Sequence, residues 1–195
     1  YVIDGLLHNN VVKSDIHSTD MHGFTETIFA ATHFIGTSFA PRFKNINQQR
    51  IYGFSARQTY ASKGYKLLPS RPINQSIIRE HWEDILRFIT TIKLKEASAS
   101  VLLRRLNSYA KDHPLYKAMK EFGRIIKTQF ILTYIDELPL RQHIEKQLNK
   151  VELSNKFAKA VFFEKNQEFT VATREEQELV ANCKSLIQNA IVLWN

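Results

Sequence analysis

Two carboxylates in this sequence stand where an acidic side chain could do chemistry, and the first is Asp20. It follows a predicted strand over residues 11–18 and precedes residues 25–35, whose apolar spacing predicts a helix. Reactive groups of α/β proteins collect at the carboxyl ends of strands, so a metal-binding aspartate is expected at such a position. The alternative is that Asp20 caps the following helix, a common role of aspartate. The motif by itself favours the capping role.

The second carboxylate is Glu152, within a helix predicted to run from Pro139 to about residue 163. On a helical wheel with about 100° per residue, apolar side chains cover most of the circumference and predict a largely buried helix. A narrow polar strip holds Glu152, Lys156 and Lys159 at positions i, i+4 and i+7. A carboxylate between two ammonium groups is either a structural ion pair or part of a site, and both interpretations stay open.

Other kinds of catalytic centre have no signature in the sequence. It contains neither a glycine-rich phosphate loop nor a nucleophile elbow, which argues against nucleotide hydrolases and serine esterases. The single cysteine, Cys183, excludes an intrachain disulfide framework and a cysteine-rich zinc site. Its apolar neighbours predict a buried, unreactive thiol. Asp20 and Glu152 therefore remain the candidate catalytic residues.

The elements that must position these carboxylates are a short α/β segment and a long helical block. Residues 1–7 form an apolar element that is either a helix or a strand, and residues 50–54 could form a second strand. From residue 75 to residue 97, apolar side chains recur at steps of four and three, which predicts one buried helical face. Further helices are expected over residues 98–111 and 115–134. The pattern indicates an α/β fold with a large all-helical part.

The positive charge is concentrated in one segment. The net charge is +8, from 27 basic and 19 acidic residues, yet no acidic residue occurs between Glu26 and Glu80. The eight basic residues of that stretch are Arg42, Lys44, Arg50, Arg57, Lys63, Lys66, Arg71 and Arg79. Because no neighbour in sequence offsets their mutual repulsion, we expect them to face a polyanion.

Aromatic side chains alternate with these cations: Phe29, Phe34, Phe39, Phe43, Tyr52, Phe54, Tyr60 and Tyr65. Cations mixed with aromatics are typical of surfaces that neutralise phosphates and stack exposed bases. The other interpretation is that the aromatics belong to the core, and it is favoured because they begin at helical spacing.

Composition limits the class of protein. A chain of 195 residues with 44% hydrophobic content can bury a core, and no apolar run approaches the roughly 20 residues that cross a bilayer. Without a signal peptide pattern, an intracellular protein without a membrane partner is expected. The chain starts without Met and stops just after an apolar run, so we expect a fragment whose site, if assembled from distant segments, is incomplete.

Several motifs in order resemble one known family. Residues 17–25 (HSTDMHGFT), 33–36 (HFIG) and 39–42 (FAPR) are similar to the patterns T-D-T-H-G-[YF]-T, H-x-[LI]-G and F-A-P-R of the replicative transposases of the Tn-three family. Residues 1–7 (YVIDGLL), 147–152 (QLNKVE) and 189–195 (NAIVLWN) resemble further elements of that family. The resemblance covers essentially the whole chain.

The resemblance implies a DDE catalytic triad on an RNase H-like fold, with a helical insertion before the last carboxylate. Asp20 would be the second aspartate and Glu152 the closing glutamate, although Val151 stands where the family usually has glycine. The first aspartate would lie upstream, outside this chain. Such carboxylates hold two Mg²⁺ ions, with Mn²⁺ as a substitute, for phosphoryl transfer. No organic cofactor is expected.

These inferences combine into one prediction of organisation. Residues 1–74 form a partial RNase H-like core with the basic stretch, residues 75–137 the helical insertion, and residues 138–195 the closing helix and a C-terminal helical segment. The DNA contacts are assigned to Arg42, Lys44, Arg50, Arg57, Lys156 and Lys159.

The function that the resemblance implies is that of part of a bacterial, cytoplasmic DNA transposase, homo-oligomeric at full length. It would cleave transposon ends at their terminal inverted repeats and join them to target DNA. Without the first aspartate, the fragment alone is expected to be inactive. The alternatives are a non-catalytic nucleic-acid-binding domain and an inactive helical fragment.

Overall fold

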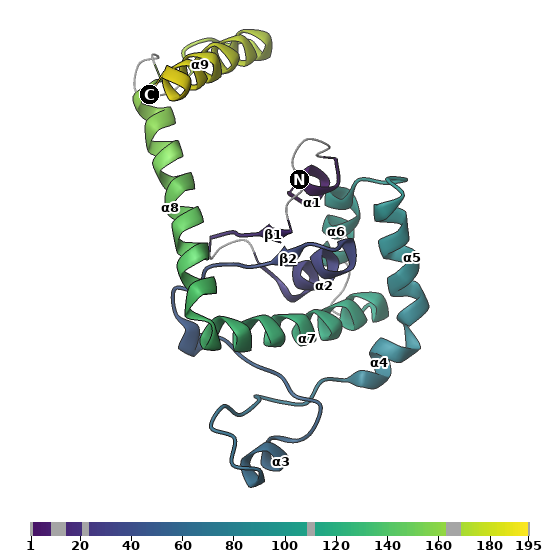
Figure 1. Cartoon of the computed structure of the whole chain (residues 1–195). Coiled ribbons are helices and arrows are strands. Elements are labelled where there is room, and N and C mark those ends of the chain that lie inside the picture. The colour runs from purple at the N-terminus through teal and green to yellow at the C-terminus, as the bar shows by residue number, and fades with distance from the viewer. Residues whose placement is uncertain (1, 9–14, 21–23, 109–111, 163–168, 195) are drawn as a thin grey trace. The chain divides into compact units, whose positions relative to one another are not determined.

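The computed structural model describes residues 2–8, 15–20, 24–108, 112–162 and 169–194, and every structural statement below concerns those residues. The chain divides into two compact units, residues 1–144 and 145–195. The first unit contains most of the secondary structure, and α8 crosses the boundary between the two (Figure 1).

In the first unit the elements are α1 (Val2–His8), β1 (Ile16–His17), α2 (Glu26–Ile35), β2 (Ser38–Phe39), the 3₁₀ helix η2 (Ile46–Gln48), α3 (Arg57–Ser62), α4 (Gln75–Glu80), α5 (Trp82–Lys93), α6 (Ala99–Ser108), α7 (Pro114–Asp136) and the start of α8 (Leu138–Ala160). The second unit holds the rest of α8 and α9 (Arg174–Trp194). None of these helices is long and apolar enough to cross a membrane.

The architecture is mostly helical with a small parallel sheet, which agrees with an α/β fold at that level of description. Within the described ranges, β1 and β2 form a two-stranded parallel sheet. The element at residues 1–7 is a helix, and the helices expected around residues 25–35, 115–134 and 139–163 are confirmed. The strand considered at residues 50–54 is not formed; its backbone makes an isolated bridge from Gly53 to Pro72 instead.

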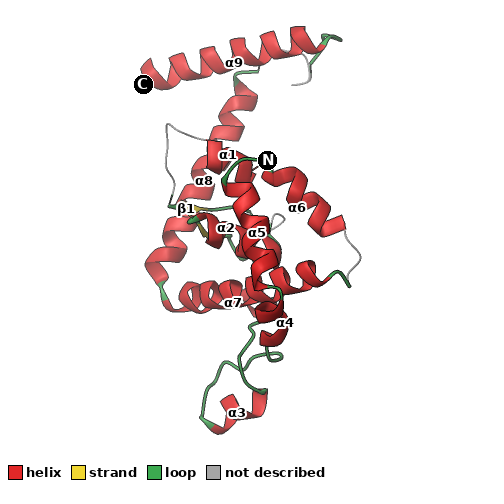
Figure 2. Ribbon diagram, turned by 90° about the vertical axis from the view of Figure 1, so that its right-hand side faces the viewer, coloured by secondary structure: helices red, strands yellow, loops and turns green. Residues whose placement is uncertain are grey.

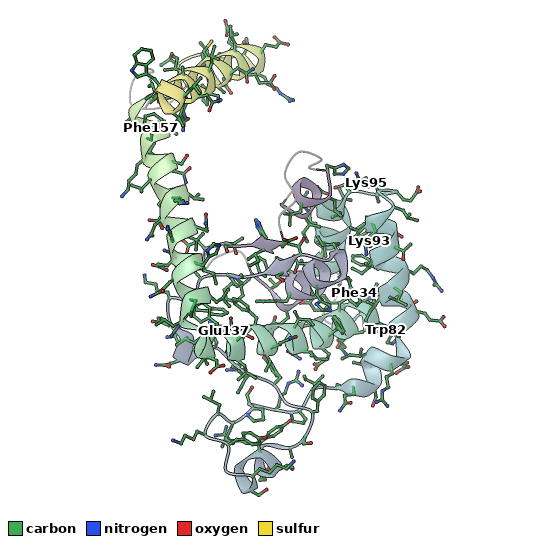
Figure 3. The ribbon with its side chains drawn as sticks, in the orientation of Figure 1. Phe34, Trp82, Lys93, Lys95, Glu137 and Phe157 are labelled. Carbon is green, nitrogen blue, oxygen red and sulfur yellow. The ribbon has the colours of Figure 1, made fainter. Side chains whose placement is uncertain are left out.

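The core of the first unit forms around α2, which packs against α5 and α7 (Figure 2). Its buried apolar side chains include Phe29, Ala30, Ile85, Ile89 and Met119. At the edge of this core, Phe34 stacks on Phe122 with ring centroids 4.7 Å apart. Trp82 also turns toward Phe34, with 5.8 Å between the ring centroids (Figure 3). The isoleucines of the face predicted from Ile78 to Ile92 are thus buried as expected, but Trp82 of the same face is 37% exposed and His81 divides the segment into two helices.

One acidic side chain of α1 has a structural role. The Asp4 carboxylate accepts hydrogen bonds from the backbone N–H groups of Ala99 (2.6 Å) and Ser100 (3.0 Å), at the start of α6. Burial raises the pKa of Asp4, but the hydrogen bonds from Ser100 and Ala99 outweigh it and lower the pKa to about 2. Asp4 therefore satisfies amides that the first turn of a helix leaves without partners.

The crossing of α2 and α7 depends on Gly123, because a Cβ atom added there would overlap the backbone carbonyl of Glu26. We expect Gly123→Ala to lower the free energy of unfolding by about 3 kcal/mol, since the two helices must separate to admit a methyl group. Gly5→Ala is the control: its Cβ would meet nothing within 4 Å, and it should stabilise α1 slightly. Urea unfolding of the wild type and both variants tests this. A Gly123→Ala midpoint equal to that of the wild type would contradict the close packing.

Two expectations about burial are wrong. Cys183 is exposed, because the partly buried stripe of α9 runs through Gln177, Val180 and Lys184, and Cys183 lies off that stripe. In α8, Ile144 and Leu148 are buried, whereas Val151 and Leu153 are 55% and 64% exposed. Most of the second half of the helix is therefore exposed, and its apolar circumference is not a measure of its burial.

Candidate functional site

Asp20 follows a regular run of parallel backbone pairing. The amides of Ser38, Ala40 and Arg42 donate to the carbonyls of Asp15, His17 and Thr19 at 2.8, 2.9 and 3.0 Å. The pairing thus extends past β1 and β2 on both sides. Pro41, which has no N–H to give, is buried between two donating residues and costs the ladder no bond. This ladder fixes the backbone of Arg42 opposite Thr19, the residue before Asp20.

The Asp20 carboxylate is presented to solvent at the carboxyl end of this ladder. Its side chain is 61% exposed, and Oδ1 lies 3.2 Å from Nη2 of Arg42, whose side chain is 20% exposed. An ion pair at such an exposed carboxylate contributes at most about 1 kcal/mol to stability. The pairing therefore neutralises Asp20 without fixing it strongly, and Arg42, which we had assigned to DNA, contacts this carboxylate in the structure.

The capping alternative for Asp20 is wrong, because Thr25 caps α2. Thr25 has extended backbone angles and its hydroxyl accepts a hydrogen bond from the amide of Ile28 at 3.4 Å. Gly36 ends the same helix in the left-handed conformation that favours glycine. A threonine directly before the first helical residue takes the cap that a more distant aspartate cannot reach, so capping does not account for Asp20.

Two polar atoms near Asp20 are buried without a hydrogen-bond partner in the described part of the chain: Nε2 of His17 and Oγ1 of Thr19. Burial also lowers the pKa of His17, which favours its neutral imidazole. A buried polar atom without a partner costs about 1–3 kcal/mol. The strand end thus combines an exposed carboxylate with two buried polar atoms for which the described residues supply no hydrogen-bond partner.

The donors at this strand end suit a hard divalent cation, because an exposed carboxylate is the ligand type that such ions prefer. Across the described ranges, however, no group of three or more His, Cys, Asp or Glu side chains could hold a metal ion. Asp20 belongs to the first unit and Glu152 to the second. The shared role of the two carboxylates remains a prediction.

Glu152 lies within α8, so the helix on which its strip was predicted is present. Glu152, Lys156 and Lys159 are all exposed. Because the helix is continuous to Ala160, the spacing i, i+4 and i+7 puts them along one face.

Six of the eight cations in the acid-free segment are exposed: Lys44, Arg50, Arg57, Lys63, Lys66 and Arg79. The remaining two, Arg42 and Arg71, are partly buried and paired with Asp20 and Glu121. Around α3 the segment extends away from α7 (Figure 1). Most of the predicted polyanion surface is therefore open to solvent.

Glu121, which holds this segment against α7, was not among the site residues predicted from the sequence. Glu121 is 8% exposed and accepts hydrogen bonds from Arg71 Nη2 (2.6 Å), from the amide of Asn74 (3.1 Å) and from Arg124. The guanidinium carbons of Arg71 and Arg124 lie 5.5 and 5.0 Å from the Tyr52 ring centroid. The one local signal was the i, i+3 spacing of Glu121 and Arg124 within α7.

The eight aromatic side chains range from buried to exposed, with Phe34, Tyr52 and Tyr60 partly buried. Phe29, Phe39 and Phe43 are buried, so the core interpretation is correct for them. Phe54 and Tyr65 are 55% and 59% exposed and lie in the basic segment.

Comparison with known proteins identifies the family. The model of the Tn3 transposase DDE domain matches residues 1–195. The chain is 39% identical to the transposase for transposon Tn501 of Pseudomonas aeruginosa, and 37% identical to those for Tn1546 of Enterococcus faecium and Tn21 of Escherichia coli. In each case all of the chain is covered, and it spans about a fifth (20%) of the relative. The chain belongs to the Tn3 transposase DDE domain family, which supports a role in DNA transposition.

Proposed function

We propose that this chain forms part of the catalytic core of a transposase that cleaves DNA at transposon ends and joins the ends to target DNA. The observation that carries the proposal is the position of Asp20, exposed at the carboxyl end of a parallel ladder in a chain of the DDE family. Glu152 is proposed as its partner carboxylate. The finer fold is proposed to be RNase H-like, with the helical block as an insertion.

The proposed cofactor is Mg²⁺, held by Asp20 and Glu152 with a further carboxylate. Bound divalent ions would activate the attacking oxygen and stabilise the leaving one. The chain's own residues have separate tasks. The backbone ladder holds Asp20 in place, and Arg42 neutralises it or a nearby phosphate. Lys156 and Lys159 would contact phosphates beside Glu152.

The exposed cations suggest the path of the DNA, whether transposon end or target. We expect Lys44→Glu, Arg50→Glu and Arg57→Glu together, in the full-length protein, to weaken duplex binding at least about tenfold at low salt. The slope of log affinity against log salt should flatten by roughly 3, because about one counterion is released per phosphate contact. Fluorescence anisotropy across a salt series measures both.

The matched control reverses three exposed cations elsewhere: Lys93 and Lys95 near the end of α5, and Arg104 of α6 (Figure 3). It changes the net charge equally. If the control flattens the slope as much as the segment variant does, the effect is one of overall charge and the proposed path is incorrect.

A non-catalytic DNA-binding role is the second candidate, since the exposed cations alone would support it. The two functions differ in their response to loss of a carboxylate. Substituting Asp20 or Glu152 should leave DNA binding intact in either case, but should remove an activity only if the chain is catalytic.

A further inference from the structure

A cavity of about 680 Å³ lies between the basic segment and α7, and it includes none of the residues around Asp20. Its walls are mainly aromatic and aliphatic, from Tyr52, Phe54, Tyr60, Tyr65, Ile73 and Leu132. Segments far apart in the sequence thus line one apolar space that is partly open to solvent.

The aromatic wall is held in place by hydrogen bonds and close packing. The Tyr60 hydroxyl accepts a hydrogen bond from the amide of Phe54 at 3.0 Å, and a side chain at Gly53 would collide with the Tyr60 ring. The Tyr65 ring lies 6.0 Å from that of Tyr60, centroid to centroid. On the α7 side, the Thr128 hydroxyl accepts a hydrogen bond from the amide of Tyr52 at 3.0 Å. The space is therefore preformed, while Phe54 and Tyr65 remain more than half exposed.

The charge around the cavity selects the kind of ligand. Lys66 contributes to the lining, no carboxylate does, and Arg57 and Lys63 are exposed on the same segment. A purely apolar ligand would make no use of these exposed cations. A ligand with a flat ring and a phosphate satisfies both features, because bases stack on aromatic side chains while the backbone is neutralised by cations.

We propose that this cavity binds an unpaired base of DNA, with Phe54 and Tyr65 stacking on the base and Lys66 meeting the adjacent phosphate. Gln129, which also lines the cavity, supplies an amide for the edge of the base. A base inside a duplex cannot enter such a space, so the ligand is a single-stranded or locally opened strand. This inference rests on the proposed function, since it assumes a protein that acts on DNA.

The test measures the affinity of the full-length protein for two oligonucleotides of equal charge. They are oligothymidylate of about 16 nucleotides and its abasic counterpart. Phe54→Ala and Tyr65→Ala should each weaken oligothymidylate binding about tenfold and leave abasic binding unchanged, since only stacking is removed. Tyr65→Phe keeps the ring and should bind normally. Phe169→Ala, at an aromatic that is 45% exposed in the second unit, is the matched control.

A second measurement identifies the contact directly, because other parts of the full-length protein also bind DNA. Photocrosslinking with 5-iodouracil in the oligonucleotide should label Phe54 or Tyr65. Alanine variants that bind oligothymidylate normally, an equal loss on the abasic strand, or crosslinks confined to other regions would each overturn the proposal. Cleavage dependent on Asp20 would be unaffected by any of these results, so failure of the base pocket is distinguishable from failure of the proposed function.

Discussion

Asp20→Asn in the full-length protein is expected to lower strand cleavage and strand transfer by about 10³-fold or more, while DNA binding and melting temperature stay close to wild type. The reason is that an amide of the same shape lacks the negative charge that binds a divalent ion, and metal-ion stabilisation contributes several kcal/mol to the transition state. Stability should change little, because the ion pair that Asp20 makes with Arg42 is exposed. Gel-based cleavage and transfer assays with Mg²⁺ or Mn²⁺, beside a thermal melt, measure these effects.

Arg42→Gln is the matched control for that experiment. It breaks the same ion pair but leaves the carboxylate, and the backbone ladder through the amide of residue 42 is retained. We expect reduced but measurable cleavage. If Asp20→Asn cuts at the wild-type rate, or loses activity only together with folding, the catalytic assignment of Asp20 is incorrect.

Local sequence patterns predicted the helices and the position of Asp20, because these features depend on residues that are close in the sequence. The apolar periods of α2 and α7 indicated these helices because one buried face repeats about every turn, whereas α8 was indicated by Pro139 at its first turn. The predicted place of Asp20 between a strand and a helix is likewise found, since Asp20 follows β1 and precedes α2. The cap of α2 could also have been read locally, since Thr25 directly precedes its first residue.

What the sequence could not indicate depends on partners distant along the chain. The sequence pattern placed Tyr52 in a strand, yet its amide donates a hydrogen bond to the Thr128 hydroxyl, 76 positions away. Glu121 fastens the basic segment through Arg71, 50 positions away. No local pattern encodes such pairs, because they form only when α7 is packed against the segment. The cavity between the basic segment and α7 forms through the same packing, so the sequence did not predict it either.

The exposed surface of α8 sharpens the test of the second carboxylate. An exposed glutamate in one helix can be exchanged without opening a core, so a loss of function at Glu152 cannot be attributed to a cavity. Lys156 and Lys159, exposed on the same face, can be tested in the same way.

Glu152→Gln is therefore expected to abolish cleavage and transfer in the full-length protein, with end binding and melting temperature unchanged. The amide keeps the shape and hydrogen-bonding capacity of the side chain and removes the charge proposed to hold the metal. Lys156→Ala and Lys159→Ala should instead weaken binding of cleaved DNA while measurable chemistry remains, because lysines contact phosphates.

Glu145→Gln provides the matched control, since Glu145 lies seven residues earlier on the same face of α8 and is also exposed. It should cleave DNA normally. If Glu152 were only the partner of the two lysines in an ion pair, all three single variants would lose a similar small amount of stability, and Glu152→Gln would stay active wherever it is folded. Melting temperature and strand transfer measured on the same set decide between these roles, and an active Glu152→Gln beside an inactive Glu145→Gln would move the closing carboxylate to Glu145.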